Sequence, residues 1–134
     1  MTIVVDASVA VKWVLPEAGS DRAAAIRTED TDLIAPSLAY AEIGSAIWRA
    51  VLRGDVDSAA AREELRLAMA HYQRIVPLEE IADRAMELAI RLRHPIYDCF
   101  YLALAERERC PMITADSRLV GAAKAMKGVE LRPL

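Results

Sequence analysis

The sequence predicts a three-layer α/β/α sandwich with a short, mainly parallel central sheet. Short β-branched runs alternate with helical patterns along the chain, and this alternation is typical of a parallel sheet covered on both faces. The chain has 134 residues, of which 54% are hydrophobic. That is enough to build one core, so we expect a single domain over residues 1–134.

Composition excludes several classes of protein. The net charge of −3 argues against a surface that attracts nucleic acid indiscriminately. No apolar run approaches the ~20 residues of a membrane span, and the first one, residues 3–5, is too short for a signal sequence. We therefore expect a cytoplasmic protein with no membrane contact. The cysteines, Cys99 and Cys110, form no disulfide framework, and Cys99 is expected in the core.

The first strand is expected over residues 2–5 and ends at Asp6. A helical pattern follows over residues 7–14, in which Ser8 is an N-cap or first-turn residue. A short helix is then expected over residues 22–28. An acid at the carboxyl end of a strand, next to a helix N-terminus, stands where open α/β sheets bind ligands.

The middle of the chain continues the alternation. We expect a strand over residues 32–35, a helix over 37–53 that contains Glu42, a helix from Asp55 or Asp57 to about His71, a strand over 74–78 and a helix over 81–93. The last third gives a helix that follows Pro95, a strand over 111–114, a helix over 117–126 and a strand over 129–131.

The helix that follows Pro95 contains the most unusual acid of the sequence. Asp98 shares a helical face with Tyr101, Leu102 and Ala105, where a carboxylate is poorly solvated. A carboxylate in such a place requires a base, a set of hydrogen-bond donors or a metal ion. Asp98 is therefore the strongest single indication of a functional site.

Three further acids are expected to join Asp98. Asp6 and Asp116 follow strands, and Glu42 begins a helix that packs against the same edge of the sheet. Crowded carboxylates repel one another, and Mg²⁺ or Mn²⁺ would relieve that repulsion because these ions prefer oxygen ligands. Ser8 and Thr114 are candidates to hold the carboxylates through hydrogen bonds.

Each acid also has a simpler interpretation. Asp6 and Asp116 are both placed to cap a helix, and a glutamate near a helix start, such as Glu42, is favoured by the helix dipole. His71 and His94 are too far apart in the sequence to predict a zinc site. The ordered set of four acids favours the catalytic interpretation over these separate ones.

The ordered motifs resemble those of PIN-domain ribonucleases, most closely the VapC toxins of type II toxin–antitoxin systems. The matching segments cover nearly the whole chain and are Val4-Val5-Asp6-Ala7-Ser8, Ala41-Glu42-Ile43, Tyr97-Asp98-Cys99-Phe100-Tyr101-Leu102-Ala103-Leu104-Ala105 and Ile113-Thr114-Ala115-Asp116-Ser117-Arg118-Leu119. By this resemblance Asp6, Glu42, Asp98 and Asp116 are the four acidic positions of the family, supported by Ser8 and Thr114. Each motif alone is weak, but the ordered set is specific.

The resemblance implies an endoribonuclease that depends on Mg²⁺ or Mn²⁺, a VapB-like antitoxin as partner, and a homodimer. Our mechanistic hypothesis is in-line attack of a metal-activated water, which leaves a 5′-phosphate and a 3′-hydroxyl. Lys12 and Arg118 are possible phosphate contacts, although either could pair with a carboxylate instead. The apolar residues around Trp48 are a candidate groove for an antitoxin helix.

Two other functions compete with this one. A non-catalytic PIN-like scaffold that binds protein or RNA is the main alternative, and the presence of all four acids argues against it. A haloacid-type phosphatase also begins with a strand-end aspartate, but it needs a second acid where this chain has Ser8.

Overall fold

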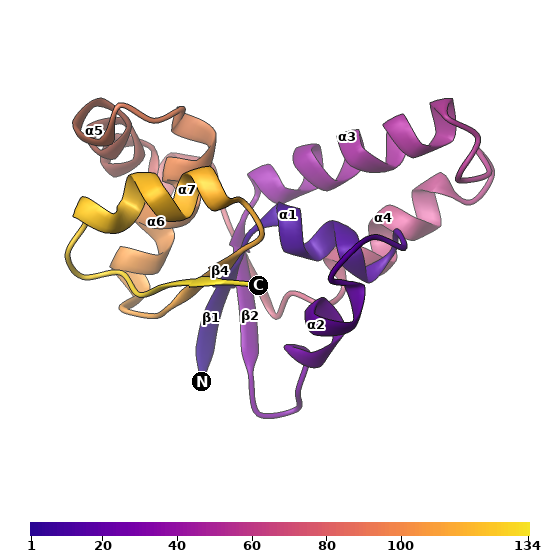
Figure 1. Cartoon of the computed structure of the whole chain (residues 1–134), viewed down its shortest axis with the longest axis horizontal. Helices are drawn as coiled ribbons and strands as arrows, with labels where there is room; N and C mark the ends of the chain where they lie inside the picture. The colour runs from indigo at the N-terminus through magenta and orange to yellow at the C-terminus, as the bar shows by residue number, and fades with distance from the viewer.

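The computed structural model describes residues 1–134. Its five strands are β1 (Thr2–Val5), β2 (Asp32–Pro36), β3 (Arg74–Val76), β4 (Met112–Thr114) and β5 (Leu131–Pro133). They form one sheet in the order β3-β2-β1-β4-β5, in which every neighbouring pair is parallel (Figure 1). The parallel sheet expected from the sequence is confirmed.

Seven α-helices connect the strands. They are α1 (Ala7–Ala10), α2 (Ser20–Ala25), α3 (Leu38–Leu52), α4 (Ala61–Met69), α5 (Ala82–Leu92), α6 (Ile96–Glu108) and α7 (Ser117–Ala122). Three short 3₁₀ helices span Val11–Trp13, Leu78–Glu80 and Ala123–Ala125. The β1–β2 and β3–β4 connections run in opposite directions along the sheet. Because such crossovers are right-handed, the helices of these two connections cover opposite faces.

The helix α6 carries much of the core. It contacts β1, β2 and β4, and α5 packs against it. Six of its residues are buried, including Tyr101 and Leu102. Apolar residues occur around most of its circumference because the sheet lies on one side and α5 on another, as expected of a helix buried within a domain. The five residues from Tyr101 to Ala105, which directly precede Glu106, are therefore core residues.

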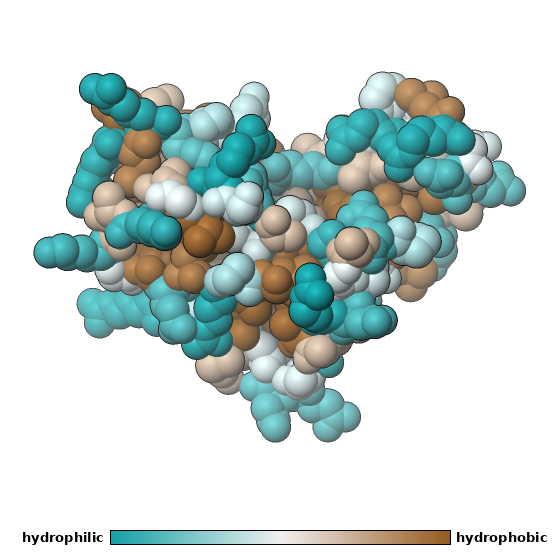
Figure 2. All heavy atoms as spheres, in the orientation of Figure 1, coloured by the Kyte–Doolittle hydropathy of each residue, from teal (hydrophilic) through white to brown (hydrophobic).

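The carboxyl ends of the strands lie at the base of a notch. Figure 1 shows β1 rising from the N-terminus toward the gap between α7 and α3. Figure 2 shows the same notch in the surface, between the half of the molecule that carries α5, α6 and α7 and the half that carries α3 and α4. The residues that follow β1 and β4 thus come together at one edge, as the parallel topology requires.

Several element boundaries differ from those expected. The last strand is Leu131–Pro133 rather than residues 129–131, because Gly128 turns the chain at φ 98° and an edge strand tolerates a proline. The third strand stops at Val76, before Pro77, and is followed by a 3₁₀ helix. Both differences arise at a glycine or a proline.

Two helices also begin at other residues than expected. Helix α4 begins at Ala61, because the Asp57 carboxylate accepts from the amide of Ala59 at 3.0 Å and stabilises a turn there. Helix α2 begins at Ser20, with Gly19 at φ 88° before it. Both helices remain where the periodicity placed them, displaced by a turn or less.

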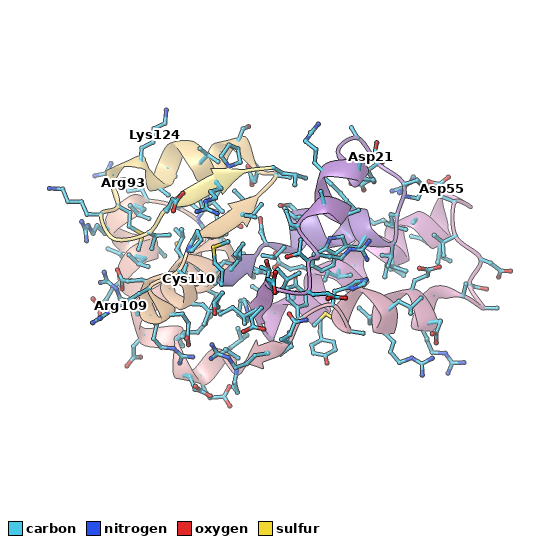
Figure 3. All side chains as sticks on the ribbon, turned by 90° about the horizontal axis from the view of Figure 1, so that it is seen from below. Asp21, Asp55, Arg93, Arg109, Cys110 and Lys124 are labelled. Carbon is cyan, nitrogen blue, oxygen red and sulfur yellow. The ribbon has the colours of Figure 1, made fainter.

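Two arginines end helices in the left-handed conformation. Arg93 follows α5 at φ 51°, and Arg109 follows α6 at φ 52°. Figure 3 shows both at the same end of the molecule, opposite to Asp55. These residues turn the chain sharply, so that α6 begins immediately after α5 and β4 begins soon after α6.

Two further observations concern the cysteines and the lengths of the helices. Both cysteines are buried and unpaired with each other. None of the helices has the length and apolar character required to cross a bilayer.

Candidate active site

Asp6 is the buried acid at the centre of the site. It stands at the end of β1 with 3% of its surface exposed. The hydroxyls of Ser8 and Thr114 both donate to its Oδ2, each at 2.7 Å. Each hydroxyl also accepts a backbone amide at 3.0 Å, from Ala115 and Asp116 respectively. Each hydroxyl has one proton, and because the hydroxyl acts as the acceptor toward the amide, its proton is free to be donated to Asp6.

The simple capping interpretation of Asp6 is wrong. Asp6 occupies the N-cap position of α1, but its side chain makes no capping hydrogen bond. Its backbone carbonyl accepts from the amides of Val9 and Ala10 instead. The carboxylate is therefore available to a ligand, apart from its bonds to the two hydroxyls.

Glu42 reaches the same site from α3. It lies beyond the first turn of that helix, so the helix dipole does not account for it. Its Oε1 accepts from the hydroxyl of Tyr101 at 2.7 Å. Tyr101 is fully buried on α6, and this hydrogen bond joins α3 to α6 next to the sheet.

Asp98 lies at the rim of the site rather than in the core. Its side chain is 21% exposed, although Tyr101, Leu102 and Ala105 on the same face are fully buried. Asp98 belongs to the first turn of α6, so its carboxylate projects past the covered part of the helix. Its partner is His94, whose Nε2 lies 2.5 Å from Oδ2 of Asp98.

Sequence reasoning missed His94. His94 lies in the turn between α5 and α6, two residues before α6 begins, so helical spacing does not predict its contact with Asp98. The left-handed turn at Arg93 places the ring, and the sequence pattern gave no signal for that turn. The histidine was considered only as a zinc ligand.

Three of the four acids are coupled through their charges. Burial is the main cause that raises the pKa of Asp6, and the nearby charge of Asp98 adds to it, whereas the two hydroxyls lower it. Burial also raises the pKa of Glu42 to about 7, with Asp6 and Asp98 contributing and the Tyr101 hydroxyl opposing. A cluster of this kind resists full ionisation unless a positive charge is close.

Asp116 is held differently. It is the N-cap of α7, and its Oδ1 accepts from the amide of Arg118 at 2.9 Å. The expected capping role is therefore confirmed. Its own amide donates to Thr114, which links it to Asp6 through one hydroxyl. Asp116 is not among the charges that raise the pKa of Asp6 or Glu42.

The donor set suits a hard divalent cation in its chemistry. Asp6, Glu42 and Asp98 offer carboxylate oxygens. The charge of Asp98 raises the pKa of Asp6, and the charges of Asp6 and Asp98 raise the pKa of Glu42. In their present positions, no three acidic, histidine or cysteine side chains converge closely enough to hold a metal ion. The three carboxylates suit a Mg²⁺ or Mn²⁺ ion because they are oxygen ligands and because the ion would relieve their mutual repulsion. To bind it, the three side chains would have to move closer together.

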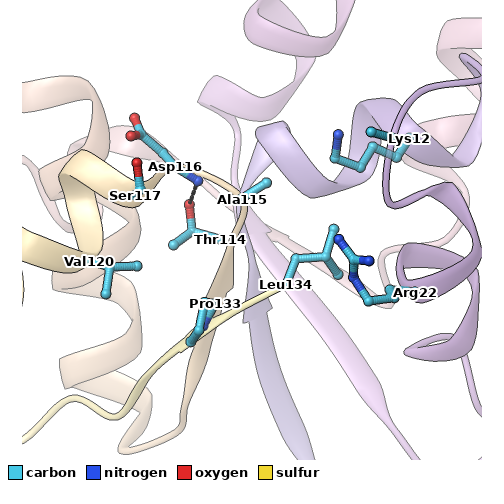
Figure 4. A pocket seen from close by; sticks show the side chains of 10 residues that line it. Lys12, Arg22, Thr114, Ala115, Asp116, Ser117, Val120, Pro133 and Leu134 are labelled. Atoms are coloured by element: carbon cyan, nitrogen blue, oxygen red, sulfur yellow. Dashed lines mark hydrogen bonds between the residues drawn. The ribbon is translucent and has the colours of Figure 1, made fainter.

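A hollow of about 320 Å³ is lined by Asp116 and Thr114, but by none of the other three acids. Figure 4 shows Lys12 and Arg22 on one side of it and Asp116 and Ser117 on the other. Lys12 pairs with Glu17 at 3.1 Å. Arg22 contributes a second cation to this hollow, and sequence reasoning did not identify it.

Arg118 points away from this hollow. Its side chain is 89% exposed and lies 3.7 Å from Asp116, and it does not line the hollow. A surface pair of this kind contributes little to stability. Of the two cations expected near the acids, the structure brings only Lys12 to the hollow.

The two tryptophans have different environments. Trp13 is half-buried, donates its indole N–H to the carbonyl of Ala23 at 2.9 Å and packs edge-on against Tyr72. Trp48 is 59% exposed and lines an apolar hollow of about 250 Å³ between α3 and α4. Val51 and Leu65 are among the other apolar residues of this hollow.

Comparison with known proteins finds relatives that are named VapC ribonucleases. The chain is 33% identical to ribonuclease VapC9 of Mycobacterium tuberculosis, over 98% of each chain. It is 37% identical to ribonuclease VapC1 of the same species over 90 residues, which are 66% of this chain and 65% of that protein. The match to VapC1 thus covers less than two thirds of its length.

A similar fold occurs in a solved structure. The crystal structure of VapBC2 from Rickettsia felis, bound to a DNA fragment from its promoter, matches with a TM-score of 0.71. The match covers 99% of this chain and 98% of that chain at 12% identity. The family model described as PIN domain matches residues 3–125 of the sequence. With this match over most of its length, the chain belongs to the PIN domain family.

Proposed function

We propose that this protein is an endoribonuclease, the toxin of a type II toxin–antitoxin system, which hydrolyses RNA phosphodiesters with Mg²⁺ or Mn²⁺. The observation that carries the proposal is the coupled set of Asp6, Glu42 and Asp98 at the carboxyl edge of a PIN-domain sheet. The names of the VapC relatives, which are ribonucleases, support it. The proposed catalytic unit is the single domain over residues 1–134.

Asp6, Glu42 and Asp98 would hold the ion, with Asp116 at the edge of the site. A bound Mg²⁺ or Mn²⁺ would supply an activated water and positive charge for the phosphate. The raised pKa values of Asp6 and Glu42 support this assignment, because carboxylates that repel one another gain most from a cation. Asp116 is the weakest member, since its Oδ1 already caps α7.

Protein side chains orient the acids. The hydroxyls of Ser8 and Thr114 donate to Oδ2 of Asp6 and hold it in place. Each of these two hydroxyl oxygens accepts in turn from a backbone amide. Tyr101 fixes Oε1 of Glu42. Because these donors are in place before substrate arrives, the acids lose little freedom on binding, which is the advantage of a preorganised site.

The phosphate backbone of RNA would contact the hollow beside Asp116. Lys12 and Arg22 line it, and both can donate to phosphate oxygens. Arg118 is a poorer candidate than we expected from the sequence, because it lies outside the hollow. Substitution of Arg22 should therefore weaken RNA binding more than substitution of Arg118.

The proposed partners are a VapB-like antitoxin and a second copy of the chain, in the cytoplasm. A fold neighbour is described as VapBC2, a toxin with its antitoxin on promoter DNA, which supports an antitoxin partner here. The apolar hollow with Trp48 between α3 and α4 is the proposed docking site, because it matches the helix-in-groove mode of recognition.

The test is cleavage of a total-RNA pool by antitoxin-free protein. Mg²⁺ or Mn²⁺ is compared with EDTA, and the wild type with Asp98→Asn. Cuts that need the metal and vanish in the variant are expected. Absence of both cleavage and Mn²⁺ binding in folded protein would contradict the proposal and favour a non-catalytic PIN-like scaffold.

The chemistry of the products tests the mechanism separately. Attack by water leaves a 5′-phosphate and a 3′-hydroxyl, which ligation and phosphatase treatment can identify. A 2′,3′-cyclic phosphate would contradict the mechanism, because it requires the ribose hydroxyl as the nucleophile.

A further inference from the structure

His94 is the one histidine that contacts a proposed metal-binding carboxylate. Its Nε2 lies 2.5 Å from Oδ2 of Asp98, and its side chain is only 12% exposed. We assign the proton of this contact to Nε2 of the histidine, because an imidazole N–H donates and a carboxylate oxygen accepts. The hydrogen bond occupies Oδ2 and leaves Oδ1 of Asp98 without a protein donor.

The backbone of His94 is held on both sides. Arg93 adopts the left-handed conformation that ends α5, and the amide of His94 then donates to the carbonyl of Ala89 at 3.1 Å. Pro95 begins the next helix and restricts His94 to an extended conformation. The Sγ of Cys99, on α6, lies 3.9 Å from the carbonyl of His94. The imidazole is therefore aimed at Asp98 by a turn with little freedom.

The other acids have comparable supports. Asp6 is held by Ser8 and Thr114, and Glu42 by Tyr101. Asp98 is 21% exposed and has no hydroxyl donor. Without His94 its side chain would be free to rotate toward solvent. The histidine thus gives Asp98 the hydrogen-bond donor that hydroxyl groups give to Asp6 and Glu42.

We propose that His94 is a positioning residue that orients Asp98 toward the shared metal site. This inference rests on the proposed function, because it assumes that Asp98 binds the ion. Hydrogen-bonding partners of metal ligands typically change metal affinity by about 10- to 100-fold when they are removed. The same range is expected here, without any contact between His94 and RNA.

The experiment titrates Mn²⁺ into antitoxin-free protein in the absence of RNA, by calorimetry. His94→Ala removes the ring, and His94→Phe keeps an aromatic ring while removing the donor. His94→Gln keeps an N–H that can reach Asp98. His71→Gln is the matched control, because His71 is the other histidine of the chain and contacts Arg27 and Trp13 instead.

We expect the Mn²⁺ dissociation constant to rise about 10- to 100-fold in His94→Ala and His94→Phe. It should stay within about threefold of wild type in His94→Gln and in the control. Cleavage of total RNA at low Mn²⁺ should follow the same order. Circular dichroism confirms that each variant is folded, and His94→Phe serves if His94→Ala is not.

Two outcomes would overturn the inference. Unchanged Mn²⁺ affinity in folded His94→Ala or His94→Phe would show that Asp98 does not need the histidine. A loss in His94→Gln as large as in His94→Ala, with His94→Phe close to wild type, would show that ring packing, not the hydrogen bond, is what matters. If the wild type itself binds no Mn²⁺, the proposed function fails and this inference fails with it. That result is distinguishable because it appears before any variant is compared.

Discussion

The hydroxyl of Tyr101 donates to Oε1 of Glu42 at 2.7 Å. The two residues are 59 positions apart in the sequence, and their contact joins α6 to α3. Tyr101 is fully buried in the core, whereas Glu42 belongs to the candidate site. One hydrogen bond therefore serves both the stability of the domain and the orientation of an acid. Neither role can be altered without affecting the other.

Tyr101→Phe should affect both roles, and each effect can be measured separately. The substitution keeps the ring and removes the donor, so we expect a loss of about 1–2 kcal/mol in the free energy of unfolding. The pKa of Glu42 should rise, because the Tyr101 hydroxyl lowers it. Urea denaturation measures the first effect, and NMR titration of the Glu42 carboxyl carbon measures the second.

Tyr72→Phe is the matched control for this pair. The hydroxyl of Tyr72 donates to the carbonyl of Val5 at 2.9 Å, so its loss should cost similar stability. It should leave the pKa of Glu42 lower than in Tyr101→Phe. Equal pKa values in the two variants would contradict the role given to Tyr101.

The metal-free protein should lose stability as the pH rises from 4.5 to 7. The pKa of Glu42 moves from its ordinary value of 4.5 to about 7 on folding, mainly through burial. Between these values the folded state binds more protons than the unfolded state, so rising pH favours unfolding. Burial also raises the pKa of Asp6, which acts in the same direction.

The expected loss from Glu42 is about 1–2 kcal/mol, allowing for solvent screening at a partly exposed group. Thermal unfolding in EDTA, followed across this pH range, measures it. Glu42→Gln should flatten the profile, and addition of Mn²⁺ at pH 7.5 should raise the melting temperature of the wild type. A melting temperature that rises with pH throughout this range would contradict the burial effect.

The convergence of Asp6 and Asp116 was predictable from the sequence. Both follow β-branched or apolar runs, and parallel strands bring their carboxyl ends to one edge of the sheet. The different use of the two carboxylates was not predictable. Asp116 caps its helix and Asp6 does not, because Ser8 and Thr114 compete for Asp6 from positions two and 108 residues away.

The burial of Asp98 was misjudged from the sequence, because its side chain is 21% exposed. Helical periodicity counts the neighbours of Asp98 on its own helix, and those neighbours are indeed buried. It does not say how far the first turn extends beyond the sheet. Asp6, which follows a short strand, is the more deeply buried acid, because β4 and Thr114 enclose it. Long-range packing decided the outcome.

Side-chain direction at the surface was also beyond the sequence. Arg118 is close to Asp116 along the chain, but it projects into solvent. Arg22 lies far from Asp116 in the sequence, but the fold brings both to the same hollow, together with Leu134 from the end of the chain. His94 depends in the same way on the left-handed turn at Arg93.

Thr114→Val should be the most damaging of the conservative substitutions near Asp6. It keeps the shape of the side chain but removes the donor to Asp6 and the acceptor for the amide of Asp116. We expect a loss of about 1–3 kcal/mol, because the amide of Asp116 loses its acceptor and the buried Asp6 loses one of its two hydroxyl donors. Ser8→Ala should cost less, since Ser8 is only half-buried and Thr114 remains.

Thr114→Ser is the control, because it retains the hydroxyl and removes only a methyl group. Its Mn²⁺ affinity should remain close to wild type, while that of Thr114→Val falls. Guanidinium denaturation and Mn²⁺ titration provide the two measurements. Equal Mn²⁺ affinity in the serine and valine variants would exclude a role for this hydroxyl in holding Asp6.

Trp48→Ala should separate partner binding from folding. Trp48 is 59% exposed, so its removal should change the free energy of unfolding by no more than about 0.5 kcal/mol. If an antitoxin helix occupies the hollow between α3 and α4, a tryptophan in its wall should contribute about 2 kcal/mol or more to binding. That corresponds to an increase of about thirtyfold in the dissociation constant.

Ile90→Ala is the matched control for Trp48→Ala, because Ile90 is 71% exposed on α5 and does not line this hollow. Binding of the purified antitoxin to immobilised toxin measures both variants. The effect should be confined to Trp48, because Trp48 shares the hollow with Val51 and Leu65 and can be buried with them by one helix. An unchanged affinity in Trp48→Ala would remove this surface as the docking site, and an equal loss in Ile90→Ala would indicate that the antitoxin binds over a wider area that includes α5.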